Sequence, residues 1–406
     1  MSTSPTHAPF GRLRVEGTRT YDAASSREVL LRGVNLQFRL GTAYTRPRVW
    51  DTALLAALPK MSCVRAVVLH WDDNKGKEDC YTPDPPYVNA LCVRQLEDVL
   101  QWSSAHGVWA IVTLRGEGAA THMFKDKSRT HELLAMWKTL ATRLNGRYRI
   151  AAYEPLSEPR VSADDSWWVA DFYSKACATL QVADPGSACL IGATPFYSRD
   201  NLERVLMKQR QLLYAFNFYV PKAYLMPAAN SSTADGAPTT SLRYPASFAC
   251  CDVYTDDHVC KASSGKAGCL RPIRVDGSFL RTELQKAVAF RDKYSVPVLL
   301  DQWGVSRESG DGRADYAQDL LQAAEEHRLP WTYWNGRQFS HVGGLTFGLL
   351  ALHRDTPAEG GTGHDTEDGL EAAEPTAAPA LRISWDDEML DQLALYLGEG
   401  PRRAEM

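Results

Sequence analysis

The chain has 406 residues, of which 44% are hydrophobic and 23% are charged, and its formal net charge is −4. This is the balance of an ordinary globular protein, and the length suits one large barrel domain with insertions. The sequence has no dense Lys/Arg run that would indicate nucleic-acid binding, and no apolar stretch of about 20 residues that would span a membrane.

Segments rich in β-branched residues alternate with amphipathic stretches, a pattern typical of a parallel sheet covered by helices. A β-hairpin is expected over Leu13–Leu31, with its turn at Asp22–Ser25. Eight strands are then predicted at 30–35, Val64–His70, Trp109–Leu114, Ala152–Leu156, Ala188–Gly192, Tyr214–Tyr219, Val296–Asp301 and Trp331–Trp334. We therefore expect an α/β fold, a (β/α)8 TIM barrel with an N-terminal β-hairpin and long inserted loops.

Helices are predicted between the strands. The segment Ser128–Asn145 repeats apolar residues at a spacing near 3.6, with Ser128 as its expected N-cap, and Asp164–Ala183 and Ala314–His327 follow the same pattern. A final helix over Trp385–Leu397 is expected to close the barrel.

Two stretches fit no regular element. Residues 222–278 are predicted to form a cysteine-containing insertion after the sixth strand. Residues 355–380, rich in Gly, Thr, Ala, Pro and acidic residues, have the composition of a disordered acidic loop. No linker divides the chain, so a single domain over 1–406 is expected.

Nine cysteines are present, an odd and mostly scattered set that favours reduced thiols. Together with the absence of a recognisable signal peptide, this predicts a cytoplasmic protein. Cys250, Cys251, Cys260 and Cys269 form a cluster that could hold free thiols, disulfides or a zinc ion, although its spacing lacks the C-x2-C pairs that zinc favours. No metal or cofactor is predicted.

Two segments carry a resemblance to a known family. Tyr153–Pro159, with the sequence YEPLSEP, resembles the strand-four motif of glycoside hydrolase family 5, the cellulase-like retaining glycosidases, which ends in Asn-Glu-Pro. Glu158 falls on the acid/base position of that motif. Pro297–Val305, with the sequence PVLLDQWGV, resembles the strand-seven motif that carries the nucleophilic Glu, and Gln302 occupies that position.

The resemblance extends unevenly to other positions of the family pattern. It implies that Arg65 is the strand-two arginine that holds the nucleophile, that Tyr219 is the strand-six tyrosine, and that Trp334 is either the sugar-stacking platform or a core residue. Three positions depart from the pattern: Arg115 stands in place of a His, Ser157 in place of an Asn and Asn217 in place of a His.

The two carboxylates of a retaining glycosidase have distinct roles. One protonates the leaving oxygen and the other attacks the anomeric carbon from about 5 Å away. A neutral glutamine amide cannot form the covalent ester, and it offers no charge to an oxocarbenium-like transition state. Since Gln302 also removes a negative charge beside Glu158, we expect Glu158 to pair with Arg115 or Arg65.

These observations predict a pseudoenzyme that binds a carbohydrate without cutting it, or that serves as a structural or protein-binding component of an assembly. The alternative is an active β-glycosidase. It could use Glu158 with Glu117 as the base that activates water, or Gln302 could be an introduced change in an active enzyme. The expected partners are therefore a carbohydrate or another protein, and the oligomeric state stays open.

Overall fold

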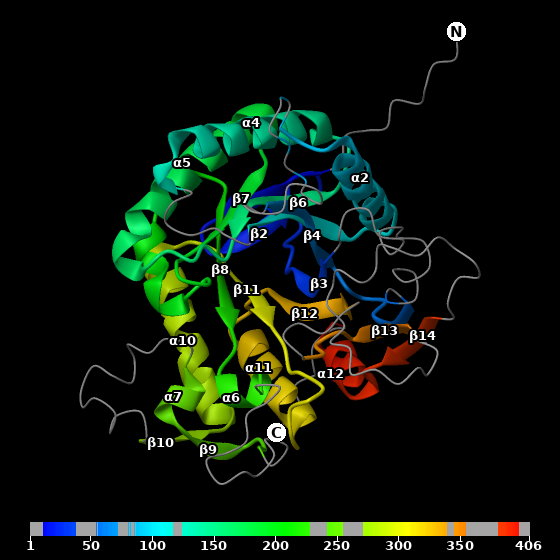
Figure 1. The fold of residues 1–406 in the computed structure, drawn as a ribbon, viewed down its shortest axis with the longest axis vertical. Helices are drawn as coiled ribbons and strands as arrows, with labels where there is room; N and C mark the ends of the chain where they lie inside the picture. The colour runs from blue at the N-terminus through cyan, green and yellow to red at the C-terminus, as the bar shows by residue number, and fades with distance from the viewer. Residues whose placement is uncertain are drawn as a thin grey trace, which may run out of the picture.

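The computed structural model describes residues 11–37, 54, 56–71, 80, 82, 85, 87–116, 124–227, 242–254, 271–338, 345–354 and 381–397. Its centre is a barrel of eight parallel strands (Figure 1): β3 Arg32–Gln37, β4 Cys63–Trp71, β5 Trp109–Gly116, β6 Ile150–Ser157, β7 Ala188–Gly192, β8 Leu212–Phe218, β11 Val298–Trp303 and β12 Trp331–Gln338. They are ordered β11-β8-β7-β6-β5-β4-β3-β12, and the pairing of β11 with β12 closes the sheet. The predicted (β/α)8 barrel is confirmed.

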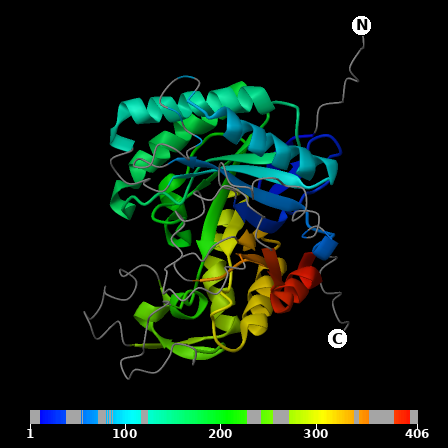
Figure 2. The same ribbon diagram turned by 45° about the vertical axis from the view of Figure 1, so that its right-hand side comes forward.

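Helices surround the strands, as Figures 1 and 2 both show. Those of eleven or more residues are α2 Ala90–Ala105, α4 Lys127–Leu144, α5 Ser166–Ala183, α10 Gly277–Tyr294, α11 Arg313–Glu326 and α12 Asp387–Leu397. Helix α4 buries Leu133, Trp137, Leu140 and Leu144, the periodic stripe that the sequence predicted. Its N-cap is Asp126, whose carboxylate accepts from the Ser128 and Arg129 amides, so the expected cap at Ser128 is wrong by two residues.

The N-terminal hairpin is tighter than predicted. Strand β1 (Leu13–Glu16) pairs with β2 (Arg19–Asp22), so the hairpin turn lies at Gly17, whose φ of 56° suits glycine. The stretch after Asp22 makes a second turn, which brings Glu28 back to bridge Tyr21. The predicted turn at Asp22–Ser25 is therefore the second of two.

Packing separates a barrel interior from an outer layer. Leu13, Leu31, Trp109, Leu190 and Leu299 belong to the interior cluster, whereas the alternate strand residues join the helices in the larger outer core. The barrel is closed by strand pairing and not by the last helix. Strand β13 (Leu350–Arg354) instead extends the sheet beside β12, followed by β14 (Leu381–Trp385). Helix α12 then packs against α11.

The insertion after β8 contains short elements in its described parts. These are α6 Lys222–Leu225, β9 Ala246–Ala249, α7 Cys250–Val253 and β10 Pro272–Val275, which lie near α10 in Figure 1. The predicted disordered loop at 355–380 lies outside the described residues.

The prediction of reduced thiols is wrong for six cysteines. Cys80 pairs with Cys92, and Cys177 pairs with Cys189. Cys250 and Cys251 are also disulfide-bonded, which confirms one of the three alternatives for those two, while Cys260 and Cys269 lie outside the described residues. The pairing of Cys177 with Cys189 depends on α5 packing against β7, and scattered sequence positions do not reveal such a contact.

Candidate active site

A buried polar cluster lies in the barrel interior and is centred on Arg65 of β4. The arginine forms a bidentate pair with Glu154 of β6, with Nε–Oε2 and Nη2–Oε1 distances of 2.7 Å, and its Nε lies 3.0 Å from Oδ1 of Asp301. Nη1 donates to Asn35 at 2.8 Å, and Nη2 donates to Ser157 at 2.6 Å. All these side chains are almost completely buried.

The cluster combines one cation with two carboxyl groups. Burial disfavours the charge on Arg65, but the carboxyl groups of Asp301 and Glu154 outweigh it and raise the pKa of Arg65 above its usual value. Burial also raises the pKa of Asp301 well above its ordinary range; Arg65 opposes this rise, whereas Glu154 and Glu158 add to it. Asp301 therefore keeps its proton to a higher pH than an exposed aspartate, and above that pH its carboxylate is paired with Arg65.

Glu158 follows the last residue of β6 and has a left-handed backbone with φ of 50°. Its Oε1 accepts a 2.6 Å hydrogen bond from Nδ2 of Asn217, which lies on β8. The expected pairing of Glu158 with Arg65 is wrong, because Arg65 is bound to Glu154 and Asp301. Strained backbone at a partly exposed carboxylate is common at functional sites.

Gln302 lies next to this pair. In the parallel pairing of β11 with β8 it is aligned with Asn217, the residue that holds Glu158. Its side chain is buried, and its Oε1 accepts a hydrogen bond of 3.3 Å from the Tyr219 hydroxyl. Burial, and then the Glu158 charge, raise the pKa of Tyr219, so this hydroxyl keeps its proton.

Trp334 of β12 is 5% exposed and packs with Val67, Leu345 and Phe347. The Arg115 guanidinium lies 5.7 Å from the centroid of the Trp334 ring, within the range of a cation–π contact. Most of the indole is therefore engaged by protein, and the arginine at the end of β5 is directed toward it.

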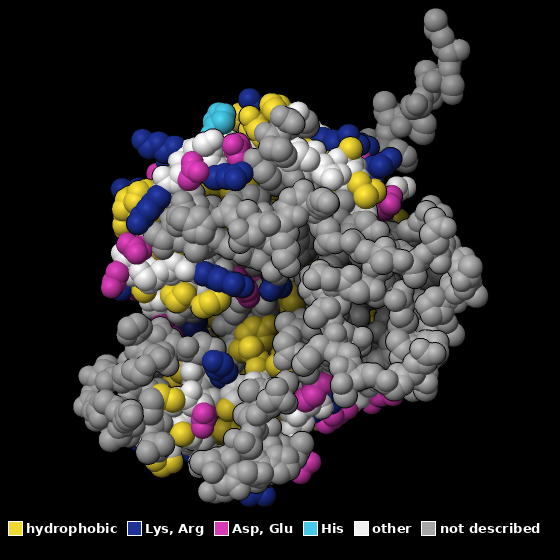
Figure 3. Space-filling view, viewed as in Figure 1, with side chains coloured by type: hydrophobic (Ala, Val, Ile, Leu, Met, Phe, Trp, Pro, Cys, Tyr) yellow, Lys and Arg dark blue, Asp and Glu magenta, His cyan; other side chains and the backbone are white. Residues whose placement is uncertain are grey.

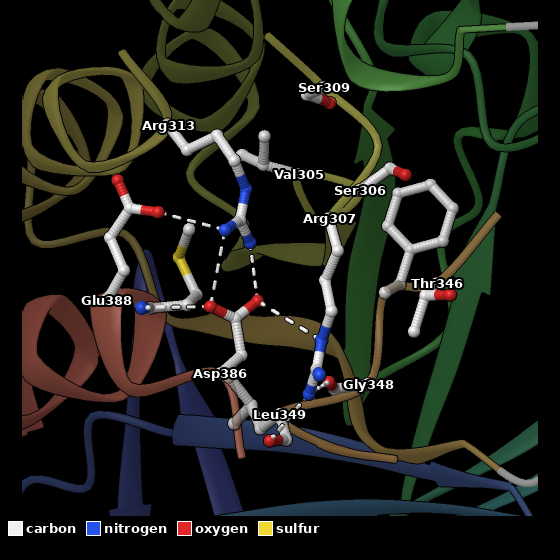
Figure 4. A network of polar contacts seen from close by, with 12 residues as sticks. Val305, Ser306, Arg307, Ser309, Arg313, Thr346, Gly348, Leu349, Asp386 and Glu388 are labelled. Carbon is white, nitrogen blue, oxygen red and sulfur yellow. Dashed lines mark hydrogen bonds and ion pairs between the residues drawn. The ribbon is translucent and has the colours of Figure 1, made fainter. Parts of the chain in front are cut away.

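A network of polar contacts holds the chain that follows Phe347, at Gly348 and Leu349 (Figure 4). Arg307 Nη2 donates to the carbonyl oxygens of Gly348 and Leu349 at 2.8 and 3.2 Å, and its Nε lies 3.7 Å from Asp386 Oδ2. Arg313 donates to both oxygens of Asp386. The stretch before α12 thus anchors one wall of the site.

A pocket of about 550 Å³ opens beside Glu158. Its lining includes Glu158, Asn217, Tyr219, Phe196 and Lys222. Figure 3 shows a hollow over the ends of β8 and β11, with hydrophobic side chains inside and Lys/Arg side chains along its borders. A volume of this size accommodates a small ligand or a sugar unit.

The structure thus brings together Arg65, Ser157, Glu158, Asn217, Tyr219 and Gln302. Glu117, the alternative base, lies outside the described residues. Sequence reasoning missed Glu154 and Asp301, although each stands within a motif that it singled out. Within the described ranges, no group of three or more His, Cys, Asp or Glu side chains is arranged to hold a metal ion. None of the helices in those ranges is long and apolar enough to cross a membrane.

Comparison with known proteins gives consistent matches. The family model described as "Cellulase (glycosyl hydrolase family 5)" matches residues 23–340. Endoglucanase C of Acetivibrio thermocellus is 21% identical over 215 residues, which is 52% of this chain and 61% of that protein, so the chain spans about three fifths of this relative.

Solved structures share the fold. The Clostridial cellulose synthase subunit Z of Clostridioides difficile superimposes with a TM-score of 0.57 at 14% identity, covering 90% of this chain and 99% of that one. A mutant lichenase from a Caldicellulosiruptor species in complex with cellotetraose superimposes with a TM-score of 0.59 at 11% identity, covering 91% and 93%. At these identities the likeness supports the fold alone.

Proposed function

Since the chain belongs to glycosyl hydrolase family 5, we propose that it is a carbohydrate-binding member that has lost retaining hydrolysis. The observation that carries the proposal is the amide at position 302. Gln302 stands at the end of β11, beside the Asn217–Glu158 pair and bonded to Tyr219, where the family resemblance calls for a carboxylate nucleophile.

The chemistry of the amide supports this proposal. A retaining mechanism requires a carboxylate that forms an ester with the anomeric carbon. Gln302 is a poor nucleophile, and its buried carbonyl oxygen already accepts a hydrogen bond from Tyr219. Replacing the charge by a neutral amide also removes electrostatic stabilisation of the transition state, which is usually the largest single contribution to catalysis.

The contacts of Arg65 also support the proposed loss of hydrolysis. The resemblance assigns it to hold the nucleophile, yet its contacts are to Glu154, Asp301, Asn35 and Ser157. The positions of Ser157, Asn217 and Arg115 also differ from the family pattern. Arg65, the residue expected to position an attacking carboxylate, therefore makes its contacts within the buried polar cluster.

We propose a β-linked glucan or a related β-glycan as the ligand of the pocket beside Glu158. The named relative is an endoglucanase, and one fold neighbour was solved with cellotetraose. Glu158 and Asn217 can exchange hydrogen bonds with sugar hydroxyls, and Phe196 and Tyr219 offer ring faces or edges. Another fold neighbour is a cellulose synthase subunit. A second proposed role is therefore that of a component of a larger assembly.

We also propose that the protein matures in an oxidising compartment and not in the cytoplasm that the sequence suggested. Two buried disulfides, Cys80–Cys92 and Cys177–Cys189, support this, since such bonds persist mainly outside the reducing cytosol.

The experiment is hydrolysis of a panel of fluorogenic β-glycosides by the unmodified protein, by Gln302→Glu and by Glu158→Ala. The proposal expects no turnover by the unmodified protein beyond that of Glu158→Ala. Turnover that Glu158→Ala abolishes would favour the alternative, an active β-glycosidase with Glu158 and a base such as Glu117.

A further inference from the structure

Asp301 and Gln302 are consecutive, yet both are buried near the barrel interior. The pairing of β11 with β8 shifts between Leu300, aligned with Phe216, and Gln302, aligned with Asn217. Asp301 is therefore the extra residue of a bulge, which lets two successive side chains approach the same region. Asp301 is 0% exposed and Gln302 is 5% exposed.

Asp301 contacts the guanidinium of Arg65, the cation of the buried polar cluster. Each of the three nitrogen atoms of Arg65 is engaged: Nε by Glu154 and Asp301, Nη1 by Asn35, and Nη2 by Glu154 and Ser157. Neither oxygen of Asp301 has a hydrogen-bond partner in the described part of the chain, so its ion-pair contact with Arg65 is its main compensation for burial.

We propose that Asp301 is a positioning residue coupled to position 302. Asp301 occupies the contact with Arg65 that a carboxylate at 302 would need. An amide at 302 and a carboxyl group at 301 therefore form a matched pair. This inference rests on the proposed function, because it explains why Gln302 is not simply a missing nucleophile. Glu154 and Asp301 already contact Arg65, and Gln302→Glu would add a further carboxyl group at the residue next to Asp301 in the chain.

The titratable and charged groups around Asp301 and Gln302 come from several strands. Strand β4 contributes Arg65, β6 contributes Glu154 and is followed by Glu158, and Tyr219 follows β8. Burial and the Glu154 and Glu158 charges raise the pKa of Asp301, against Arg65. A carboxyl group added at 302 would also be buried, beside the Tyr219 hydroxyl and the strand position of Asn217, which holds Glu158.

The test follows the added carboxyl group by ¹³C NMR in protein labelled at the glutamate side-chain carboxyl carbon. The variants are Gln302→Glu and the double variant Asp301→Asn/Gln302→Glu, and difference spectra against the parents identify the new signal. Removing Asp301 should lower the pKa of the added carboxyl by at least about one unit, a tenfold change in its acid dissociation constant.

The matched control is Asp184→Asn combined with Gln302→Glu. Asp184 is also 0% exposed and paired with an arginine, Arg12, but it precedes β7, at the opposite end of the strands. Equal titration of the added carboxyl with and without Asp301, or an equal shift caused by Asp184→Asn, would overturn the inference.

Folding itself provides a second readout. If Gln302→Glu does not fold while Asp301→Asn/Gln302→Glu does, the coupling is supported. If both fail, Asp301 is not what excludes the carboxylate. Neither readout requires a sugar, so turnover by the unmodified protein would overturn the proposed function alone, and unchanged titration would overturn this inference alone.

Discussion

Arg65 and Glu154 form a bidentate ion pair in the barrel interior, with two N–O distances of 2.7 Å and both side chains at 1% exposure or less. Arg65→Met would leave Glu154 and Asp301 without their shared cation. Removing one partner of such a pair costs about 3–5 kcal/mol. Urea denaturation should show this loss. Arg14→Ala, which breaks the exposed pair with Glu16, is the control and should change stability by less than about 1 kcal/mol.

The raised pKa of Asp301 should make the stability of the fold depend on pH in an unusual direction. Because burial raises its pKa in the folded protein, the folded chain retains a proton that the unfolded chain loses above about pH 4. Its contribution to stability is therefore largest at low pH and is lost as pH rises toward the folded pKa. Asp301→Asn cannot ionise, so its stability relative to the parent should improve as the pH is raised from about 4 toward neutral.

Chemical denaturation of both proteins across that range measures this difference. Asp164→Asn is a suitable control, since it removes a carboxylate whose side chain is 97% exposed. A relative stability of Asp301→Asn that falls with rising pH would contradict the assignment of a raised pKa to Asp301.

The disulfides should contribute substantially to stability. Cys177 and Cys189 are separated by 12 residues, and closing a loop of this length stabilises a fold by about 3 kcal/mol in the chain-entropy treatment. Cys177→Ser/Cys189→Ser should therefore melt at a lower temperature than the parent under oxidising conditions. Thiol labelling of the unreduced, unfolded parent, read by mass spectrometry, should modify Cys63 and spare Cys177; labelling of Cys177 would refute the pairing.

Asp386 should contribute more to the stability of the fold than Glu388, which lies two residues further along the chain. Its side chain is 4% exposed and accepts from Arg313, whereas Glu388 is 45% exposed and bonds the same arginine. Asp386→Ala should cost about 3 kcal/mol and make 381–397 more sensitive to proteolysis. Glu388→Gln should cost less than about 1 kcal/mol. Equal effects of the two changes would argue against Asp386 as the anchor of this wall.

The sequence was sufficient to predict the barrel because its strands carry strong local signals. Ala188–Gly192 was predicted with its observed bounds, and the seven other strands lie within a few residues of their predicted positions. Apolar runs that alternate with amphipathic helices leave few other arrangements. The hairpin turn was misplaced because Gly17 and Asp22–Ser25 are both acceptable turn sites, and local composition does not rank them.

The sequence singled out several residues that the structure brings together, but it did not predict their contacts. Glu158, Gln302 and Tyr219 were found through motifs, yet the partner of Glu158 is Asn217 and not an arginine. The role of Asp301 depends on a one-residue bulge in β11, and strict alternation along a strand would direct the side chains of residues 301 and 302 to opposite faces. Register irregularities of this kind leave no signal in a single sequence.

The central claim is that the cleft binds a β-glycan without cleaving it. The most direct test incubates the unmodified protein with cellotetraose, measures binding by calorimetry and analyses the same mixture for shorter sugars, beside Glu158→Ala as the control. We expect measurable binding with no products above that control. Release of shorter sugars by the unmodified protein, abolished in Glu158→Ala, would contradict it.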